Sequence, residues 1–355
     1  MRILIATSQV PFLRGGAEAH AEGLLRALQA AGHEADIAAI PLQWHPPERI
    51  LDSMLACRLL DVRECSGVRT DLLIGLKFPA YLIQHPRKVL WIIHQHRAAY
   101  DLWGHPLGDL HRFPIGAQVR EAIVAADRKL IPEARAVYAN SRNVARRLHR
   151  YCGIEAYPLY HPPPHAERFF CADAEGDGAE DFLFFPSRLN RSKRQELVLE
   201  ALALTRQPVV VCFSGAADEP AYAEELRALA ASHGLEERAR WLGHLSEEEK
   251  IARYARSLAV VFPPVDEDYG YVPLEAMLSS KPVITCTDSG GPLEFVEPGA
   301  TGLVADPTAA SLAEAMDRLW ENRAEARSMG QAARERYAGL RISWGNVVAA
   351  LLADG

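Results

Sequence analysis

Short apolar runs recur along the chain, and stretches with apolar residues at helical spacing separate them. In the first half such runs cover residues 2–7, 36–40, 72–74, 89–93 and 137–139. Between the first two runs, Leu24, Leu25 and Leu28 lie on one face of a helix expected over 17–30. Gly32 fits the end of that helix. Strands that alternate with helices predict a Rossmann-like parallel sheet.

The second half repeats this pattern after a small, acidic stretch. Residues 172–181 are only Ala, Gly, Asp and Glu, so they cannot build a core and are predicted to be a linker. Strands are then expected over 182–185, 209–213, 240–242, 258–262 and 283–285. Helices are expected over 196–204, 221–233, 247–256 and 311–339, with an amphipathic helix over 343–352. The pattern predicts two domains, 1–170 and 181–340, and a C-terminal segment, 341–355.

Composition favours a water-soluble protein of the reducing cytoplasm. No apolar run approaches the roughly 18 residues that a transmembrane helix needs. The six cysteines are scattered without a Cys-x-x-Cys pair, which argues against a zinc site or a disulfide framework.

Charge is shared unevenly between the halves. Residues 1–170 carry 21 Lys and Arg against 16 Asp and Glu, whereas residues 171–355 carry 18 against 30. A basic first half would suit an acidic acceptor or peripheral contact with the inner, anionic face of a membrane. An excess of only five positive charges is also typical of an ordinary solvated surface. We favour this second interpretation of the first half. The acidic total and the lack of a reader motif argue against nucleic-acid binding.

Glu267 and Glu275 are the strongest candidates for a functional site. Pro263 and Pro264 must end the strand over 258–262, so Glu267 falls in the loop at its carboxyl end. A helix that starts at Pro273 places Glu275 in its first turn. Both carboxylates are then expected at the edge where open α/β sheets bind ligands. The spacing alone equally fits a solvated loop acid and a helix-capping acid.

Other polar and glycine-rich segments also follow predicted strands. Gly15 and Gly16 come after the first strand, where backbone N–H groups without a neighbouring Cβ can approach phosphate. Arg188 and Lys193 follow the strand over 182–185 and are candidates for binding phosphate. Arg191 and Arg194 of the same loop could compete for that contact.

The remaining candidate segments follow the strands over 283–285 and 89–93. Gly290, Gly291 and Glu294 come after the first of these. His94 and His96 come after the second, on the same predicted face.

In this order the segments resemble retaining glycosyltransferases of family 4, also called glycosyltransferase group 1. The shared elements are the Glu-x7-Glu pair, the first Gly-Gly loop, the Arg188–Lys193 segment, the Gly-Gly-x-x-Glu element and a strand-end histidine. The resemblance implies the α/β GT-B fold, with two Rossmann-like domains facing across a cleft. It assigns acceptor binding to 1–170 and nucleotide-sugar binding to 181–340, and 341–355 would form a helix that crosses back to the first domain.

The resemblance also implies the reaction and the residues that would carry it out. A sugar would pass from a UDP- or GDP-linked donor to an acceptor hydroxyl, with its anomeric configuration retained, in polysaccharide or glycoconjugate biosynthesis. Glu267 and His94 would contact the donor sugar, and Glu275 the ribose. Arg188 and Lys193 would hold the diphosphate.

Further donor contacts are implied for Gly15, Gly16, Gly270, Tyr271, Val272, Gly291 and Glu294. The acceptor would be a sugar, a lipid-linked molecule or another small molecule. No cofactor and no metal are expected, because Arg188 and Lys193 can supply the charge that a metal would. Asp266 and Asp268 form an Asp-x-Asp pair that could bind a divalent ion in another glycosyltransferase architecture, one without two Rossmann halves.

Two other functions would use the same nucleotide-sugar site. One is a GT-B-fold sugar-nucleotide epimerase, which needs no acceptor. The other is a catalytically silent nucleotide-sugar-binding protein. Product analysis distinguishes the three.

Overall fold

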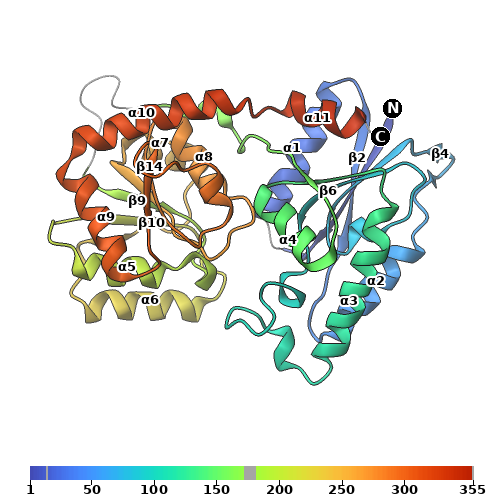
Figure 1. Cartoon of the computed structure of the whole chain (residues 1–355), viewed down its shortest axis with the longest axis horizontal. Helices are drawn as coiled ribbons and strands as arrows, with labels where there is room; N and C mark the ends of the chain where they lie inside the picture. Colours follow the sequence, from blue (N-terminus) through green and yellow to red (C-terminus); the bar gives the residue numbers. More distant parts are fainter. Residues whose placement is uncertain (13–14, 172–180, 354–355) are drawn as a thin grey trace. The chain divides into compact units, whose positions relative to one another are not determined.

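The computed structural model describes residues 1–12, 15–171 and 181–353, which form two compact units (Figure 1). Unit 1 comprises Met1–Pro164 and Ile342–Gly355, and unit 2 comprises His165–Arg341. The linker predicted over 172–181 lies outside the described residues except for Asp181. Within the described ranges, every helix is too short or too polar to cross a bilayer.

Unit 1 is built on a six-stranded parallel sheet of order β2-β1-β5-β6-β7-β8. Its strands are β1 (Arg2–Gln9), β2 (Glu34–Pro41), β5 (Leu72–Lys77), β6 (Lys88–His94), β7 (Ala136–Ala139) and β8 (Tyr157–Pro158). Its helices are α1 (Gly16–Ala30), α2 (Glu48–Leu59), α3 (Gly116–Leu130), α4 (Arg142–Cys152) and α11 (Trp344–Ala353). A small antiparallel pair, β3 (Glu64–Cys65) with β4 (Val68–Arg69), connects α2 to β5.

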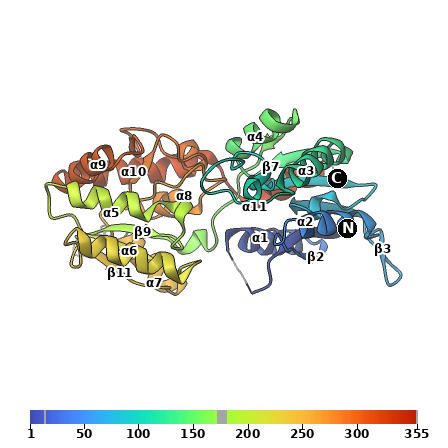
Figure 2. The ribbon, with the colours of Figure 1, turned by 90° about the horizontal axis from the view of Figure 1, so that it is seen from below.

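The central strands of unit 1 are buried on both faces because helices cover both sides of the sheet (Figures 1 and 2). In β6, Val89, Trp91 and Ile93 pack in one cluster with α1 and α11. Leu90 and Ile92 pack in the other, with α2, α3 and α4. Side chains of a strand point alternately to opposite faces, so a continuous apolar run is what a doubly covered strand requires.

Unit 2 repeats the architecture with the order β11-β10-β9-β12-β13-β14, and its neighbouring strands are again parallel. Its strands are β9 (Leu183–Pro186), β10 (Val211–Ser214), β11 (Ala239–Trp241), β12 (Ala259–Val261), β13 (Val283–Cys286) and β14 (Gly302–Ala305). Its α-helices are α5 (Gln195–Leu204), α6 (Pro220–Ser232), α7 (Glu247–Arg256), α8 (Tyr271–Leu278), α9 (Ala309–Glu321) and α10 (Arg323–Leu340). The strand order reverses between β9 and β12, so the fold has its topological switch point there.

The predicted strands and helices are present, and the α/β fold class is confirmed. Elements that were not predicted are α2, α3, β8 and the β3–β4 pair in unit 1, and β14 in unit 2. The helix expected from Pro273 starts two residues earlier, at Tyr271. Gly270 precedes it with φ +85°, a conformation that lets the chain turn directly from the loop into the helix.

α11 packs on α1 through a cluster of four buried or half-buried rings. His20 lies 4.0 Å from Trp91 and 4.2 Å from His161, between ring centroids, and Trp344 of α11 lies 5.4 Å from His161. A Cβ on Gly23 would lie 2.3 Å from the Trp344 ring, so only glycine permits this approach. Burial lowers the pKa of His161 to about 3 and lowers the pKa of His20 well below its usual 6.5. Both rings are therefore neutral in the folded unit at neutral pH.

A second buried titratable group lies on the other face of the same sheet. Asp127 of α3 accepts hydrogen bonds from the Tyr81 and Tyr100 hydroxyls at 2.9 and 2.7 Å and from the Gln95 amide at 2.8 Å. Burial nevertheless raises the pKa of Asp127 from 3.8 to about 6. The folded state therefore binds the Asp127 proton more tightly than the unfolded chain does. The stability that this proton adds is fully present below pH 3.8 and is lost as the pH rises through about 6.

We expect acidification to destabilise unit 1 through His20 and His161. Because their pKa values are lower in the folded state, the unfolded chain binds more protons once the pH falls below 6.5. Each histidine then costs about 1.4 kcal/mol of unfolding free energy per pH unit. Asp127 has the opposite sign, but one carboxyl cannot offset two histidines.

The measurement is the urea midpoint at about pH 7.5 and about pH 5. His161→Phe keeps a ring in the cluster and should reduce the loss on acidification, whereas Asp127→Asn should increase it. An identical loss in wild type and His161→Phe would contradict the assignment to this histidine.

Candidate functional site

Three loops of unit 2 meet at the carboxyl ends of the neighbouring strands β9, β12 and β13. The Val265 N–H donates to the Ser192 carbonyl oxygen at 2.7 Å, which joins the loop after β12 to the loop after β9. The Asp266 N–H donates to the Asp288 carbonyl oxygen at 2.9 Å, which joins it to the loop after β13. The edge of the sheet where the sequence placed the candidate residues is thus a set of mutually bonded loops.

Glu267 lies in the middle of this arrangement. Its N–H donates to the Ser289 carbonyl at 3.0 Å, and its own carbonyl accepts from the Gly291 N–H at 2.8 Å. Its carboxylate forms an ion pair with the Lys193 ammonium, and both side chains are mostly buried, at 21% and 15% exposure. The structure therefore brings together Glu267 and Lys193, two residues 74 positions apart in the chain. Partial burial strengthens this pair relative to one at an open surface.

Glu275 is buried on α8 and its carboxylate is bonded within unit 2. One oxygen accepts from the Tyr254 hydroxyl at 2.6 Å, and the other is 3.0 Å from the Lys250 ammonium. Both partners belong to α7. The side chain is in the second turn of its helix, since α8 starts earlier than expected. Both of its oxygens thus have protein partners, and a ligand hydroxyl would have to share them.

Arg188 is bonded on the other side of the β9 loop. Its guanidinium donates to Asp218 in the loop after β10 at 2.6 Å, and Asn190 donates to the second oxygen of Asp218 at 2.7 Å. The Arg188 side chain is 53% exposed. Arg191 extends away from Glu267, because it pairs with Glu225 of α6 and lies over the Tyr222 ring. Within the loop after β9, Arg188 thus pairs with Asp218 on one side, and Lys193 pairs with Glu267 on the other.

The glycine pair after β13, Gly290 and Gly291, lies where the backbone of the loop after β12 comes too close for a side chain. A Cβ on Gly291 would lie 2.5 Å from the Tyr269 carbonyl oxygen and 2.9 Å from that of Asp268. Gly290 has φ +70°, which favours glycine. Glu294 ends the short helix that begins at Gly291, and its carbonyl oxygen lies 3.3 Å from Arg336 of α10.

The last two predicted donor contacts of unit 2 are at the start of α8. Tyr271 opens the helix, and burial raises the pKa of its hydroxyl. Val272 is 8% exposed. They adjoin Glu267 through Gly270, so the Glu-x7-Glu segment lies in one turn and the helix that follows it.

The unit 1 candidates lie at the carboxyl ends of β1 and β6. Gly15 and Gly16 begin α1, and the Gly15 N–H donates to the Glu18 carboxylate at 2.8 Å. A phosphate at this N–H would have to displace Glu18, which also lies 3.8 Å from Lys77 at the end of β5. Glu18 was not predicted, although a glutamate three residues into a helix is a frequent cap.

His94 and His96 remain alternatives at the end of β6. The His94 Nδ1 is 2.8 Å from the Gln95 carbonyl oxygen. His96 lies against Phe78, and burial lowers its pKa to about 4. His96 is therefore neutral at neutral pH.

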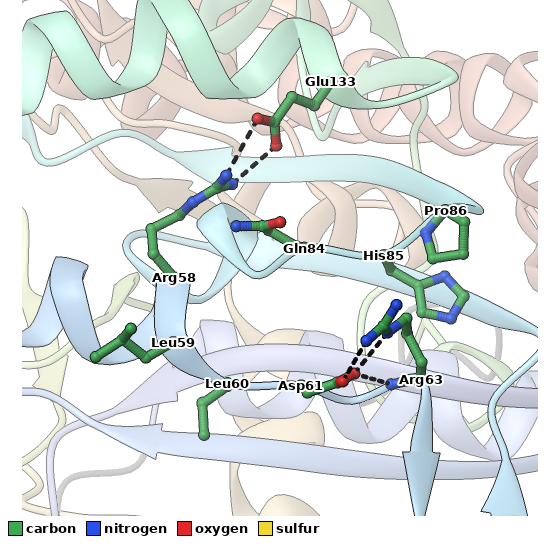
Figure 3. A pocket seen from close by; sticks show the side chains of 9 residues that line it. All are labelled: Arg58, Leu59, Leu60, Asp61, Arg63, Gln84, His85, Pro86 and Glu133. Atoms are coloured by element: carbon green, nitrogen blue, oxygen red, sulfur yellow. Dashed lines mark hydrogen bonds and ion pairs between the residues drawn. The ribbon is translucent and has the colours of Figure 1, made fainter.

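A separate cavity of about 440 Å³ lies in unit 1 (Figure 3). Its lining includes Gln84 and His85, which precede β6, and Glu133, which precedes β7. Arg58 is bonded to Glu133 and Arg63 to Asp61. The cavity is at the amino ends of these strands, opposite to the edge where open α/β sheets bind ligands.

Asp266 and Asp268 are the pair that the sequence offered as metal ligands. Among residues 1–12, 15–171 and 181–353, no three His, Cys, Asp or Glu side chains gather closely enough to hold an ion. The Asp266 backbone, in the loop before Glu267, has φ +41°, and its N–H is bonded to the Asp288 carbonyl oxygen.

Residues 172–336, which include Arg188, Lys193, Glu267, Glu275 and Glu294, match the family described as glycosyl transferases group 1. Over these residues the chain is similar to the group 1 family. A relative in sequence is the alpha-1,3/1,6-mannosyltransferase ALG2 of Dictyostelium discoideum, 29% identical over 176 residues. That match covers 44% of this chain and 42% of the relative, so the chain aligns with less than half of the relative's length.

Two solved structures share the fold of this chain over its whole length. The sucrose-phosphate synthase of Thermosynechococcus elongatus has a TM-score of 0.80 at 20% identity, covering 100% of both chains. Anabaena Alr3699/HepE, solved in complex with UDP and glucose, has a TM-score of 0.72 at 18% identity, also covering 100% of both. The predicted GT-B fold with two Rossmann-like domains is thereby confirmed.

Four residues of the candidate site in unit 2 were missed by sequence reasoning. Asp218, Lys250 and Tyr254 hold the predicted residues Arg188 and Glu275, and Asp288 shapes the loop before Glu267. Asp288 adjoins the recognised Gly-Gly element, so its position was a usable signal. The other three come from a loop and a helix whose sequences carry no motif of their own.

Proposed function

We propose that the chain is a retaining glycosyltransferase that moves a sugar from a UDP- or GDP-linked donor to an acceptor hydroxyl. The observation that carries this proposal is the Lys193–Glu267 pair, which lies within the family-matched stretch at adjacent strand ends. The names of the relatives support it, because one is a mannosyltransferase and another was solved with UDP and glucose.

In the proposed reaction the residues of unit 2 bind the donor. Lys193 and Arg188 exchange their carboxylate partners for diphosphate oxygens and neutralise the charge that develops as the glycosidic bond breaks. Glu267, released from Lys193, accepts hydrogen bonds from sugar hydroxyls and orients the ring. Glu275 shares its oxygens with the ribose hydroxyls, while Tyr254 and Lys250 keep the carboxylate in position.

The remaining features of the proposal concern unit 1 and the product. Unit 1 would bind the acceptor, with His94 or His96 near the donor sugar. No residue is proposed as a covalent nucleophile, so the leaving diphosphate oxygen would take the acceptor proton on the face that it leaves. The pathway would be polysaccharide or glycoconjugate synthesis in the cytoplasm, without a metal or cofactor, with peripheral membrane contact left for experiment to decide.

A panel of UDP- and GDP-sugars tests the proposal. A donor at 100 times its dissociation constant should stabilise the protein by about 2.7 kcal/mol, which a thermal melt detects. Donors that bind are then incubated with candidate acceptors, and the glycoside's anomeric configuration is assigned by NMR. An altered sugar nucleotide without free UDP or GDP would instead indicate an epimerase, and binding without any product would indicate a silent binding protein.

Arg188→Ala should weaken donor binding about 10-fold or more, because a charged hydrogen bond contributes roughly 1.5–3 kcal/mol. Asp218→Asn is the matched comparison, since it removes the carboxylate that competes with the diphosphate for Arg188. Binding in this variant should be as tight as in wild type or tighter. Calorimetric titration measures both, and unchanged affinity in Arg188→Ala would remove this residue from the donor site.

A further inference from the structure

Arg194 combines an unfavourable backbone conformation with an unusually well-bonded side chain. The residue immediately precedes α5 and has φ +60° and ψ +46°, in the left-handed region where a Cβ is disfavoured. A glycine would adopt this conformation more easily. The backbone therefore gives no reason for an arginine at this position, and the reason must lie in the contacts of its side chain.

The Arg194 guanidinium, from the loop after β9, bonds to the loop that carries Glu267 and to the loop after β13. Its Nε donates to the Pro263 carbonyl at 2.6 Å, and one terminal nitrogen donates to the Pro264 carbonyl at 2.8 Å. The two terminal nitrogens also form a bidentate pair with Asp288, at 2.9 and 2.6 Å. The side chain is 13% exposed, so water competes little for these bonds.

The Arg194 guanidinium bonds to a part of the loop after β12 that cannot donate backbone hydrogen bonds of its own. Pro263 and Pro264 follow β12, and neither can donate a backbone hydrogen bond. Glu267 follows three residues after Pro264, beyond Asp266 with its φ of +41°. Backbone bonds and the Lys193–Glu267 pair attach the Val265–Glu267 part of this stretch to the loops after β9 and β13, and the guanidinium bonds to its two prolines.

We propose that Arg194 is a positioning residue that fixes the Glu267 carboxylate for sugar transfer by clamping the 263–267 loop between its two neighbours. This inference rests on the proposed function, since it names a residue that serves the same site. Arg194 itself touches no substrate in this proposal. It differs from Lys193, which contacts the Glu267 carboxylate directly, and from Arg191, which pairs with α6.

The test is Arg194→Gly, compared with Ser280→Gly as the matched control. Glycine removes the clamp but suits the backbone, so the variant should fold and melt close to wild type. Ser280 also has a positive φ, +55°, and lies before β13 at the opposite end of the strands. Its replacement reproduces the backbone change without touching the three loops.

We expect kcat of Arg194→Gly to fall about 10- to 100-fold, because a displaced reacting group costs rate. The donor dissociation constant should change little, since Lys193 and Arg188 remain. Millimolar methylguanidinium should restore part of the lost rate, whereas the same concentration of tetramethylammonium should not. Arg194→Lys should recover little, because an ammonium cannot replace a bidentate fork. Ser280→Gly should keep wild-type kcat.

Amide hydrogen exchange provides a readout that needs no activity. Peptides that cover 263–270 should exchange faster in Arg194→Gly than in wild type or Ser280→Gly. If the wild type transfers no sugar, the proposed function fails, and the exchange experiment still decides whether Arg194 holds the loop. Unchanged exchange would overturn the clamp. A loss of kcat that methylguanidinium does not restore and that follows a lower melting temperature would reduce Arg194 to a structural role.

Discussion

Glu267→Gln is expected to lower the rate of sugar transfer by about 10²- to 10³-fold, the usual effect of removing one electrostatic contact to the reacting centre. Glutamine has nearly the same shape but no charge, so it can neither pair with Lys193 nor accept two hydrogen bonds from sugar hydroxyls through a carboxylate. The effect should appear in kcat. The measurement is release of free nucleotide in the presence of acceptor, over a range of donor concentrations.

Glu225→Gln is the matched control for this change. Glu225 is also a glutamate of unit 2 in an ion pair, but its partner is Arg191 and its side chain is 55% exposed. An exposed pair of this kind contributes little, so both turnover and stability should stay near those of wild type. Wild-type turnover in Glu267→Gln, with Glu225→Gln equally active, would exclude Glu267 from the mechanism.

Gly291→Ala is expected to damage both the fold of the site and its activity. The added Cβ would lie 2.5 Å from the Tyr269 carbonyl oxygen, and a backbone atom cannot rotate away as a flexible side chain can. Forcing apart two packed segments typically costs about 1–3 kcal/mol of unfolding free energy. Because the Gly291 N–H also bonds the Glu267 carbonyl, the same displacement moves the candidate catalytic carboxylate and should lower kcat.

Gly339→Ala separates this effect from the general consequence of replacing glycine. Gly339 is in α10, and a Cβ there would meet nothing within 4 Å. Alanine in a helix is favoured over glycine by up to about 1 kcal/mol, so this variant should be as stable as wild type or more so. Urea midpoints and kcat are measured for both. If Gly291→Ala leaves the urea midpoint and kcat unchanged, the loops after β12 and β13 can move apart without loss of stability or activity, and this prediction is wrong.

The candidate residues of the site were predictable because each follows a strand. Strand ends can be recognised in a sequence from an apolar run followed by proline, glycine or charge, as at Phe262–Pro263–Pro264. Carboxyl ends of neighbouring parallel strands then share one edge of the sheet. That reasoning placed Glu267 and the basic segment 187–194 at this edge without coordinates, and the resemblance to family 4 then singled out Arg188 and Lys193 in that segment. The structure brings Lys193 and Glu267 into contact.

The partners of those residues were not predictable, because they depend on which strands are neighbours. β9 lies between β10 and β12, so the β9 loop contacts Asp218 on one side and Glu267 on the other. No local pattern in the sequence specifies that order. Lys250 and Tyr254 of α7 likewise reach Glu275 of α8 only in the folded unit, because no local pattern in the sequence relates the two helices.

The sequence by itself determined the class of fold, the division into two α/β halves and the segments that follow strands, because apolar periodicity and turn residues act locally. Only the tertiary structure decided which charges neutralise one another. Arg191, Lys193 and Arg194 lie within four residues, yet they bond to α6, to Glu267 and to the Pro263–Asp288 region respectively. The backbone around Arg194 directs each side chain to a different neighbour, and those neighbours are brought close only by the packing of strands far apart in the chain.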